Sequence, residues 1–551
     1  MMNREQNLKK LAGQAFDLLV IGGGITGAGI AREAALRGLK VALVEAGDFG
    51  SGTSSRSTKL IHGGLRYLKN FEFRLVKESV TERQRLLAMA PHLVKATPFL
   101  FPVYQGDPDG LLKLHVGLAF YDWFAGAGNP IPHTMQPPGS LVALEPSLRA
   151  EGLRGGAVYG DSRTDDARLT MAVLQSAAAH GVALVNYAAV QGFRKDGAGR
   201  ITGAVVTDRL TGGEIAVQAG RVLAAAGPWA DAVRQLDDPA AKPLLRLTKG
   251  IHLTVPKARL PVSHCVVIRG RDGRMMFAVP HGDYTYAGTT DTDYTGDPAA
   301  VRAEGPDVAY VLDALHRSFP SAAIGFGDVV STWAGLRPLL RPVGIKDPSA
   351  TSRDYKLFTS PSGLITVAGG KLTAFRAMAE HIVDGLFPAA GRHTGKSTAP
   401  LPGATAPGVT DAEIAGLAER TGVEVSVVSR LVDYYGGNFG SVAAAWGPGG
   451  AGLVEAGLEP GEAEPGHPAA LRWTLARVRH AVNAEMATRL EDVIWRRTDL
   501  MLFTPDNSSP LLDRLAGEMA GLLGWSDSRR QAEIAICRDR IRQMHAWREE
   551  V

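Results

Sequence analysis

Cysteine is nearly absent from this 551-residue chain, which holds only Cys265 and Cys537. Two isolated thiols exclude a disulfide framework, a C-x-x-C redox pair and an iron–sulfur site with all its cysteine ligands from this chain. Long apolar runs are missing too, because no stretch reaches the roughly 18 apolar residues that indicate a membrane-spanning helix. Residues 1–16 lack the apolar core of a signal peptide. We therefore expect a cytoplasmic protein whose membrane contacts are at most peripheral.

The chain also has no large excess of charge of one sign. Lys and Arg number 60 and Asp and Glu number 56, which gives a net charge of +4. We find no basic block, no zinc-ligand spacing and no RNA-binding signature, so we expect neither a nucleic-acid partner nor a metal site. The chain is too long for one hydrophobic core, so we expect two or three domains.

Residues 17–45 carry the clearest positive signal. An apolar strand, a glycine turn, a helix and a second apolar strand follow one another and end on Glu45. Gly22 allows the tight turn, Gly24 lets the backbone approach a pyrophosphate, and Gly27 lets the helix pack against the strand. The helix N-terminus offers N–H groups to phosphates, and Glu45 can accept hydrogen bonds from ribose hydroxyls. The pattern predicts a dinucleotide site, with a plain strand–turn–helix unit as the alternative.

Later segments repeat this α/β character and then become helical. Strands are expected near 182–190, 201–208 and 221–226, and the last leads into Gly227 at a strand end, where open α/β sheets place cofactors. Residues 246–345 alternate short β-rich segments with loops, which predicts an antiparallel sheet. Residues 363–382 return to strand, Gly-Gly turn and helix, so the cofactor domain is predicted to be assembled from distant segments.

Several motifs occur together in a fixed order, and they carry a family resemblance. They are TSSRSTKLIHGGLRYL (53–68), DDARL (165–169), AGPW (226–229), GTTDTDYTGDP (288–298), GLRPL (335–339), SRDY (352–355), GGKLT (369–373) and LEDVIWRRTDL (490–500). With the glycine fingerprint they resemble the FAD-dependent glycerol-3-phosphate dehydrogenases of the aerobic, quinone-reducing type, over about residues 17–500. The resemblance implies an α/β + α architecture: a glutathione-reductase-like FAD-binding Rossmann domain, an antiparallel-sheet substrate-capping lobe and a helical C-terminal domain.

The resemblance also divides the chain into expected units. These are an N-terminal extension (1–16), an FAD-dependent oxidoreductase region (17–400) and a helical C-terminal domain with a tail (401–551). Within the second unit, the FAD-binding segments are expected at about 17–90, 165–235 and 350–390, and the substrate-capping segments at about 91–164 and 240–349.

The implied activity is the oxidation of sn-glycerol 3-phosphate to dihydroxyacetone phosphate, with electrons passed to a membrane quinone from the cytoplasmic face. Only one dinucleotide fingerprint is visible, so the bound nucleotide must do the redox chemistry itself, which FAD can do. Cofactor-binding residues are expected at Gly22, Gly24, Gly27, Glu45, Thr53, Ser54, Ser55, Ser57, Lys59, His62, Gly64, Gly227, Gly370, Lys371, Leu372 and Thr373. The helix that begins near Thr373 can aim its N–H groups at the flavin edge where negative charge develops.

Binding a small phosphate dianion requires cations. The motifs supply Arg66 with Tyr67, Arg337, Arg353 and Lys371, and each cation taken alone would more often be a surface cation or a salt-bridge partner. Thr290 and Asp291 are expected to orient the substrate or these cations, with turn chemistry as the competing interpretation. Proton removal favours a group with a near-neutral pKa. We therefore expect the catalytic residues to be His252, Arg337 and Lys371, with Arg337 as an electrostatic clamp; a packed strand histidine is the alternative for His252.

Three further questions stay open at the level of sequence. Residues 110–125 are apolar and aromatic, which fits an interfacial membrane segment and a core helix equally. The rival functions are an FAD-dependent oxidase that uses oxygen on glycerol 3-phosphate or on another small hydroxy or amino acid, and a flavin-binding scaffold without turnover. The role of the tail after about residue 509 and the presence of a homodimer are also undecided.

Overall fold

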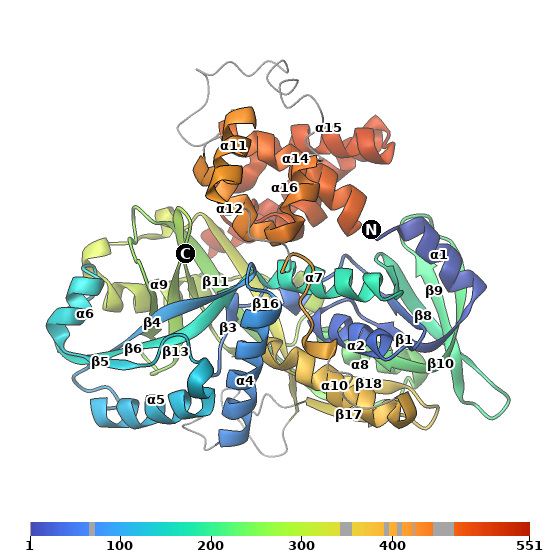
Figure 1. The fold of residues 1–551 in the computed structure, drawn as a ribbon, viewed down its shortest axis with the longest axis horizontal. Helices are drawn as coiled ribbons and strands as arrows, with labels where there is room; N and C mark the ends of the chain where they lie inside the picture. Colours follow the sequence, from blue (N-terminus) through green and yellow to red (C-terminus); the bar gives the residue numbers. More distant parts are fainter. Residues whose placement is uncertain are drawn as a thin grey trace.

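The computed structural model describes residues 2–64, 72–341, 355–390, 396–404, 410–421, 425–444 and 468–551. Two mixed sheets form separate lobes, and a helical domain built from the C-terminal part of the chain lies across both (Figure 1). The predicted α/β + α architecture is confirmed. None of the helices in the described ranges combines the length and the hydropathy needed to cross a membrane.

The first sheet contains the glycine fingerprint. Its central strands run parallel in the order β18–β10–β1–β2–β7, with β17 antiparallel at the edge and β8 and β9 continuing antiparallel from β10. The parallel strands read as continuous apolar runs because both faces of the sheet are covered. The strands are β1 (Ala15–Ile21), β2 (Val41–Val44), β7 (Ala183–Val185), β8 (Ala188–Lys195), β9 (Ile201–Asp208), β10 (Glu214–Ala224), β17 (Tyr355–Thr359) and β18 (Ile365–Gly369).

Helices from three distant parts of the chain pack together on this sheet. They are α2 (Ile25–Leu36), α7 (Asp166–Ala179) and α10 (Phe375–Leu386). The first residues also belong here, because α1 (Arg4–Gly13) contacts β7 and β10 and Arg4 pairs with Asp208 at 2.6 Å. The prediction of a cofactor domain assembled from distant segments is therefore confirmed.

The second sheet is larger and mostly antiparallel. Its order is β15–β11–β14–β13–β12–β4–β6–β3, with β16 paired to β11 and β5 paired to β6. The predicted antiparallel sheet is confirmed for β11 to β16, and the structure adds β4 and β6, two long strands from residues 94–164. The strands are β3 (Leu60–Ile61), β4 (Val94–Tyr104), β5 (Thr134–Gln136), β6 (Leu153–Thr164), β11 (Leu245–Pro256), β12 (Cys265–Arg269), β13 (Met275–His281), β14 (Tyr284–Gly288), β15 (Thr292–Asp293) and β16 (Ser331–Leu340).

Two hydrophobic cores cover this second sheet. One includes α9 (Gly305–Ser318) and the other joins the sheet to the helical domain. At the lower edge in Figure 1, α5 (Leu111–Ala125) packs on α4 (Phe73–Met89), while α6 (Pro138–Leu144) lies against β6. The core-helix interpretation of residues 110–125 is correct for one face of α5, where Leu114, Leu118 and Tyr121 are buried.

The helical domain contains α11 (Asp411–Thr421), α12 (Val425–Tyr435), α13 (Phe439–Ala444), α14 (Pro468–Glu485), α15 (Leu512–Leu523) and α16 (Asp527–His545). The helix expected over 468–500 does not run through. It ends at Glu485, Met486 takes a left-handed backbone conformation (φ 57°), and a separate π-helical turn, η12, spans Asp492–Arg497. A left-handed residue cannot continue a right-handed helix, and the break brings the arginines of η12 against the first sheet.

Candidate functional site: a dinucleotide cradle that opens into a buried cavity

The glycine turn has the geometry that its sequence predicts. Gly22 has φ +112°, and a Cβ atom at Gly27 would lie 1.9 Å from the carbonyl oxygen of Gly22. Gly24 precedes the first turn of α2, and Ile25 N–H donates to Ser54 Oγ at 2.9 Å. The turn therefore accepts only glycine at its tight positions and points the N-terminus of α2 at a phosphate.

Glu45 closes the cradle at the end of β2. Its two carboxylate oxygens accept hydrogen bonds from Gly23 N–H and Gly47 N–H, each at 2.7 Å. Burial raises the pKa of Glu45, while these two backbone donors oppose that change. A carboxylate has about four lone-pair sites, so two backbone bonds leave acceptor capacity for ribose hydroxyls. The cradle fits the adenosine diphosphate half of FAD.

The loop 53–59 lies between the cradle and the second sheet, and it divides into two groups. Thr53 Oγ1 donates to Leu336 O at 2.6 Å, and Ser55 Oγ is buried with no hydrogen-bond partner in the described ranges. Asp166 binds both Ser57 and Lys59, which were predicted to donate to the cofactor. The Lys59 ammonium lies 2.6 Å from Asp166 Oδ1, and Lys59 is not among the residues that line the cavity described below. The cofactor contacts of these two residues stay a prediction.

A partly enclosed cavity of about 230 Å³ continues from this loop to the second sheet. Ten of the predicted site residues line it: Thr53, Ser57, His62, Gly64, His252, Arg337, Gly370, Lys371, Leu372 and Thr373. Other lining residues are Thr58, Tyr159, Asp161, Phe277 and Gly250. Segments that are hundreds of residues apart in sequence thus meet around one space between the two sheets.

Three cationic residues line this cavity, Arg56, Arg337 and Lys371, and acceptors hold the last two in place. Arg337, on β16, lies 3.2 Å from Asp291 Oδ1 and donates to Thr289 Oγ1 at 2.9 Å and Thr290 O at 3.0 Å. Asp291 also pairs with Arg274 at 3.3 Å. Thr290 and Asp291 are buried and do not line the cavity, so their contacts orient Arg337, which agrees with one of the predicted alternatives.

Lys371 lies in the turn after β18, at the start of the predicted strand–turn–helix. Its ammonium donates to His62 O at 2.8 Å and to Ser79 Oγ at 3.2 Å, and Thr373 Oγ1 donates to the same carbonyl at 3.3 Å. Residues Leu372–Ala374 form a 3₁₀ turn that opens α10. The N–H groups of this turn and the Lys371 charge therefore lie together on the cavity wall.

His252, on β11, is one of two histidines that line the cavity, with His62. Its Nε2 atom lies 3.0 Å from Thr58 Oγ1, its ring stacks on Trp333 with 4.7 Å between centroids, and its Nδ1 atom has no hydrogen-bond partner in the described ranges. Burial lowers the pKa of His252 well below 6.5, and the positive charges of Arg337 and Lys59 lower it further. The imidazole is therefore neutral at pH 7 and able to accept a proton.

Sequence reasoning missed several polar residues of the cavity wall, and Asp161 is the acidic one among them. Asp161, on β6, is buried and bonded to Tyr121 Oη at 2.9 Å and to Arg83 Nη1 at 3.0 Å. Tyr121 Oη also accepts from Gly63 N–H at 2.8 Å, and burial raises the pKa of Asp161. A single aspartate within a strand belongs to no motif, so no local signal pointed to it. The predicted residues Arg66, Tyr67 and Arg353 lie outside the described residues, and Gly227 lies at the predicted turn after β10.

Comparisons with known proteins agree with this geometry. The family model "FAD dependent oxidoreductase" matches residues 17–378, and the model "C-terminal domain of alpha-glycerophosphate oxidase" matches residues 396–530. An aerobic glycerol-3-phosphate dehydrogenase of Staphylococcus aureus is 36% identical over 544 residues, which covers 96% of this chain and 95% of the relative.

Solved structures give the same result. The glycerol-3-phosphate dehydrogenase of Bacillus halodurans, complexed with FAD, is 32% identical, with a TM-score of 0.80 over 98% of this chain and 97% of its own. Glycine oxidase from Geobacillus kaustophilus, at 22% identity and a TM-score of 0.52 over 67% of this chain and 94% of its own, shares the fold alone. The resemblance read from the motifs is confirmed, and the chain belongs to the FAD-dependent aerobic glycerol-3-phosphate dehydrogenases.

Proposed function

We propose that the protein oxidises sn-glycerol 3-phosphate to dihydroxyacetone phosphate and that the electrons pass from FAD to a membrane quinone. The observation that carries the proposal is the convergence of Arg337, Lys371 and the neutral His252 on a single cavity beside the dinucleotide cradle. Arg337 and Lys371 match a phosphate dianion, and His252 matches a hydroxyl that must lose its proton. A substrate with only a carboxylate would need fewer cations.

In this proposal Arg337 and Lys371 bind and orient the phosphate. Asp291 and Thr289 hold the Arg337 guanidinium, so little side-chain freedom is lost when substrate binds. Arg353 and Arg66 with Tyr67 are proposed to complete the anion site. Arginine remains protonated at all accessible pH values, so Arg337 acts as an electrostatic clamp and not as the base.

The glycine turn and Glu45 would hold FAD, which would supply a hydride acceptor beside the cavity. His252 takes the proton of the C2 hydroxyl, because its imidazole is neutral in the empty site. Arrival of a phosphate dianion beside Arg337 offsets the positive charge that depresses the His252 pKa, so the imidazole becomes a stronger base once substrate is present. Stacking on Trp333 keeps the ring in one orientation.

A membrane surface is the proposed source of the quinone, and α5 is the proposed contact. Leu112, Val116, Phe120 and Trp123 are all exposed, Leu112 by 77% and Trp123 by 72%. Their spacing places them on one side of the helix, opposite the buried Leu114 and Leu118 side. A surface helix that is apolar on both faces has an apolar face left for lipid, with Trp at the level that interfacial aromatics prefer. We place this contact on the cytoplasmic face of the membrane.

Anaerobic reduction tests the substrate directly. The purified holoenzyme is mixed with sn-glycerol 3-phosphate without oxygen, and the flavin absorbance near about 450 nm is followed. We expect rapid bleaching in the wild type, and intact flavin but little bleaching in Arg337→Gln, which removes the charge at a position outside the cradle. Wild-type kcat/KM in that variant would remove Arg337 from the anion site.

The same experiment separates the rival functions. A reduced enzyme that is reoxidised by a soluble quinone faster than by oxygen supports the dehydrogenase, and the reverse order supports the oxidase. Flavin that binds but does not bleach with glycerol 3-phosphate or with other hydroxy or amino acids would leave a scaffold without turnover.

A further inference from the structure

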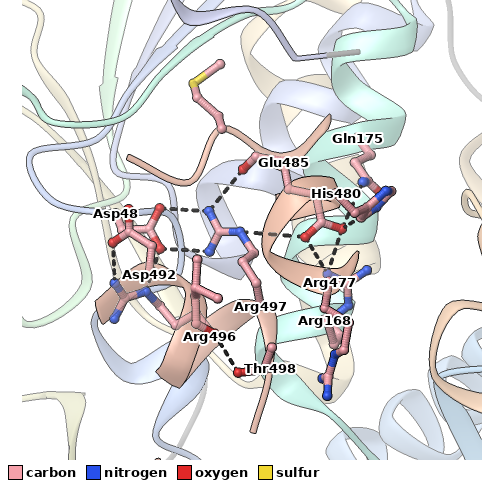
Figure 2. Close-up of polar contacts among 12 residues, drawn as sticks. Asp48, Arg168, Gln175, Arg477, His480, Glu485, Asp492, Arg496, Arg497 and Thr498 are labelled. Carbon is pink, nitrogen blue, oxygen red and sulfur yellow. Dashed lines mark hydrogen bonds and ion pairs between the residues drawn. The ribbon is translucent and has the colours of Figure 1, made fainter. Parts of the chain in front are cut away.

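A buried cluster of charged side chains joins the helical domain to the loop that follows Glu45 (Figure 2). Asp48 is fully buried and meets two consecutive arginines of η12. Arg497 donates from Nη1 and Nη2 to the two carboxylate oxygens at 2.7 and 2.8 Å, and Arg496 Nε lies 2.5 Å from Oδ2. We call Asp48, Arg496 and Arg497 the Asp48 clamp.

The clamp is balanced by further buried charges. Arg496 donates to Asp492 Oδ1 at 2.7 Å, and Arg497 lies 3.8 Å from Glu485 Oε2 and donates to the Glu485 carbonyl at 3.1 Å. The two arginines lower the pKa of Asp48 to about 2 although burial opposes this. Buried charges are costly unless they are paired in good geometry. The Asp48 carboxylate is therefore restricted to the position in which it pairs with both Arg496 and Arg497.

η12 is a π-helical turn, and its last two residues, Arg496 and Arg497, both reach the same carboxylate. Asp492, at the start of the turn, accepts from the N–H groups of Thr488 and Arg489 at 2.9 Å and so fixes how the turn begins. Such π-helical turns occur frequently at functional sites.

Asp48 in turn is part of the FAD cradle. Its neighbour Phe49 is buried, and a Cβ atom at Gly23 would lie 2.7 Å from Phe49 Cδ1 and 3.0 Å from Glu45 Cβ. Gly50 N–H donates to Gly23 O at 3.0 Å. Loop 45–50 and the glycine turn are therefore one packed unit, and a shift of Asp48 moves the groups that face the ribose and the pyrophosphate.

We infer that Arg496 and Arg497 are positioning residues for FAD: by holding Asp48 they fix loop 45–50 in the conformation that receives the adenosine ribose and the pyrophosphate. The helical domain thereby sets the affinity for the adenosine diphosphate half of the cofactor, although Arg497 is 449 residues away in sequence from Asp48. The arginines touch neither substrate nor the reacting atoms.

The alternative is that the clamp only attaches one domain to another. Arg168 on α7 provides a control, because it binds Glu485 of the same helical domain with two 2.7 Å contacts and is also buried. Glu485 lies 3.8 Å from Arg497 as well, so this control changes the charge beside the clamp but removes no contact with Asp48. Arg168 has no contact with loop 45–50 among those described. Arg168→Met removes a buried charge across the same interface and spares the loop.

The test uses full-length protein from which FAD has been removed, and it measures the dissociation constants of FAD, ADP and FMN. ADP carries the adenosine ribose and both phosphates, whereas FMN carries the flavin ring and a single phosphate and lacks the adenosine. We expect Arg497→Gln and Asp48→Asn to raise the Kd of FAD and ADP by about tenfold or more, with FMN changed by less than about twofold. Arg168→Met should change all three by less than about twofold.

The inference also requires coupling within the clamp. The double variant Asp48→Asn/Arg497→Gln should lose no more FAD affinity than the worse single variant, since both remove one interaction. If Arg497→Gln does not fold, Asp48→Asn, which keeps the side-chain volume, decides by the same comparison. Equal losses for FMN and ADP, equal losses in Arg168→Met, or FAD Kd values within about twofold of wild type in the clamp variants would each overturn the positioning role.

Discussion

At the scale of single residues, the chemistry of the site depends on His252 being neutral before substrate arrives. Burial and the charges of Arg337 and Lys59 lower its pKa well below 6.5. A base must be deprotonated to act, and a lowered pKa extends the deprotonated form to lower pH. We therefore predict that the acid limb of kcat/KM that belongs to His252 lies below pH 6.5, so that activity at pH 6.5 remains close to its plateau.

The pH profile of a matched variant identifies that limb. The phosphate of the substrate titrates near about pH 6 and contributes a limb of its own. In His252→Gln we expect kcat/KM to fall by about a hundredfold or more, the limb of the imidazole to vanish and the limb of the phosphate to remain. An imidazole limb at or above pH 6.5 would contradict the electrostatic account of the site.

Which residues could be predicted from sequence depends on how local their signal is. Gly22, Gly27 and Glu45 belong to one strand–turn–helix–strand unit, so their spacing alone predicts the cradle. Arg337 and His252 were identified only through family motifs, because a strand arginine or histidine is most often structural. The clamp between Asp48 and Arg497 joins residues 449 apart in sequence and has no local pattern at all.

At the scale of elements, α5 is a case in which the local sequence does not predict which face is buried. Its sequence is apolar on every side, so periodicity could not separate a core helix from an interfacial one. The structure resolves this by burying one face and exposing the other. Likewise, the break at Met486 turns an expected helix into two pieces and creates the π-helical turn that carries Arg496 and Arg497. A left-handed methionine has no sequence signature, since glycine is the usual residue there.

We predict that the exposed apolar side chains of α5, which include Leu112 and Trp123, contribute to membrane binding. Burying one large apolar side chain is worth about 1.5–3 kcal/mol, so the double variant Leu112→Ser/Trp123→Ser should bind phospholipid vesicles at least about tenfold more weakly. The measurement is co-sedimentation with vesicles, and turnover with a soluble quinone should be unchanged. Leu522→Ser/Ile536→Ser removes two exposed apolar side chains from α15 and α16 and serves as the control. Equal vesicle binding by wild type and the α5 variant would remove α5 from the membrane contact.

At the scale of the whole molecule, the tail after residue 509 connects the helical domain back to the second sheet. Helices α15 and α16 lead into a final 3₁₀ segment, η14 (Ala546–Glu550), which contacts α9, and the C-terminus lies near α9 and β11 in Figure 1. Thr332 Oγ1 donates to Met544 O at 2.6 Å, and Gly305 N–H donates to Glu550 Oε2 at 2.7 Å. The tail therefore attaches the C-terminal end of the chain to the lobe that carries His252 and Arg337.

Trp547 attaches the tail to the second lobe, because its side chain is fully buried in the hydrophobic core that contains α9. Trp547→Ala should cost about 3–5 kcal/mol of stability through the cavity it leaves, and the loss should appear where the tail is attached. We expect faster amide hydrogen exchange in α9 and β16, with FAD affinity unchanged, since the cradle lies in the other lobe. Trp525→Ala removes a half-buried indole from the same tail and should leave α9 protected. If α9 exchanges equally in both variants, or if Trp547→Ala releases FAD, the tail acts on the whole molecule and not as a local anchor of the second sheet.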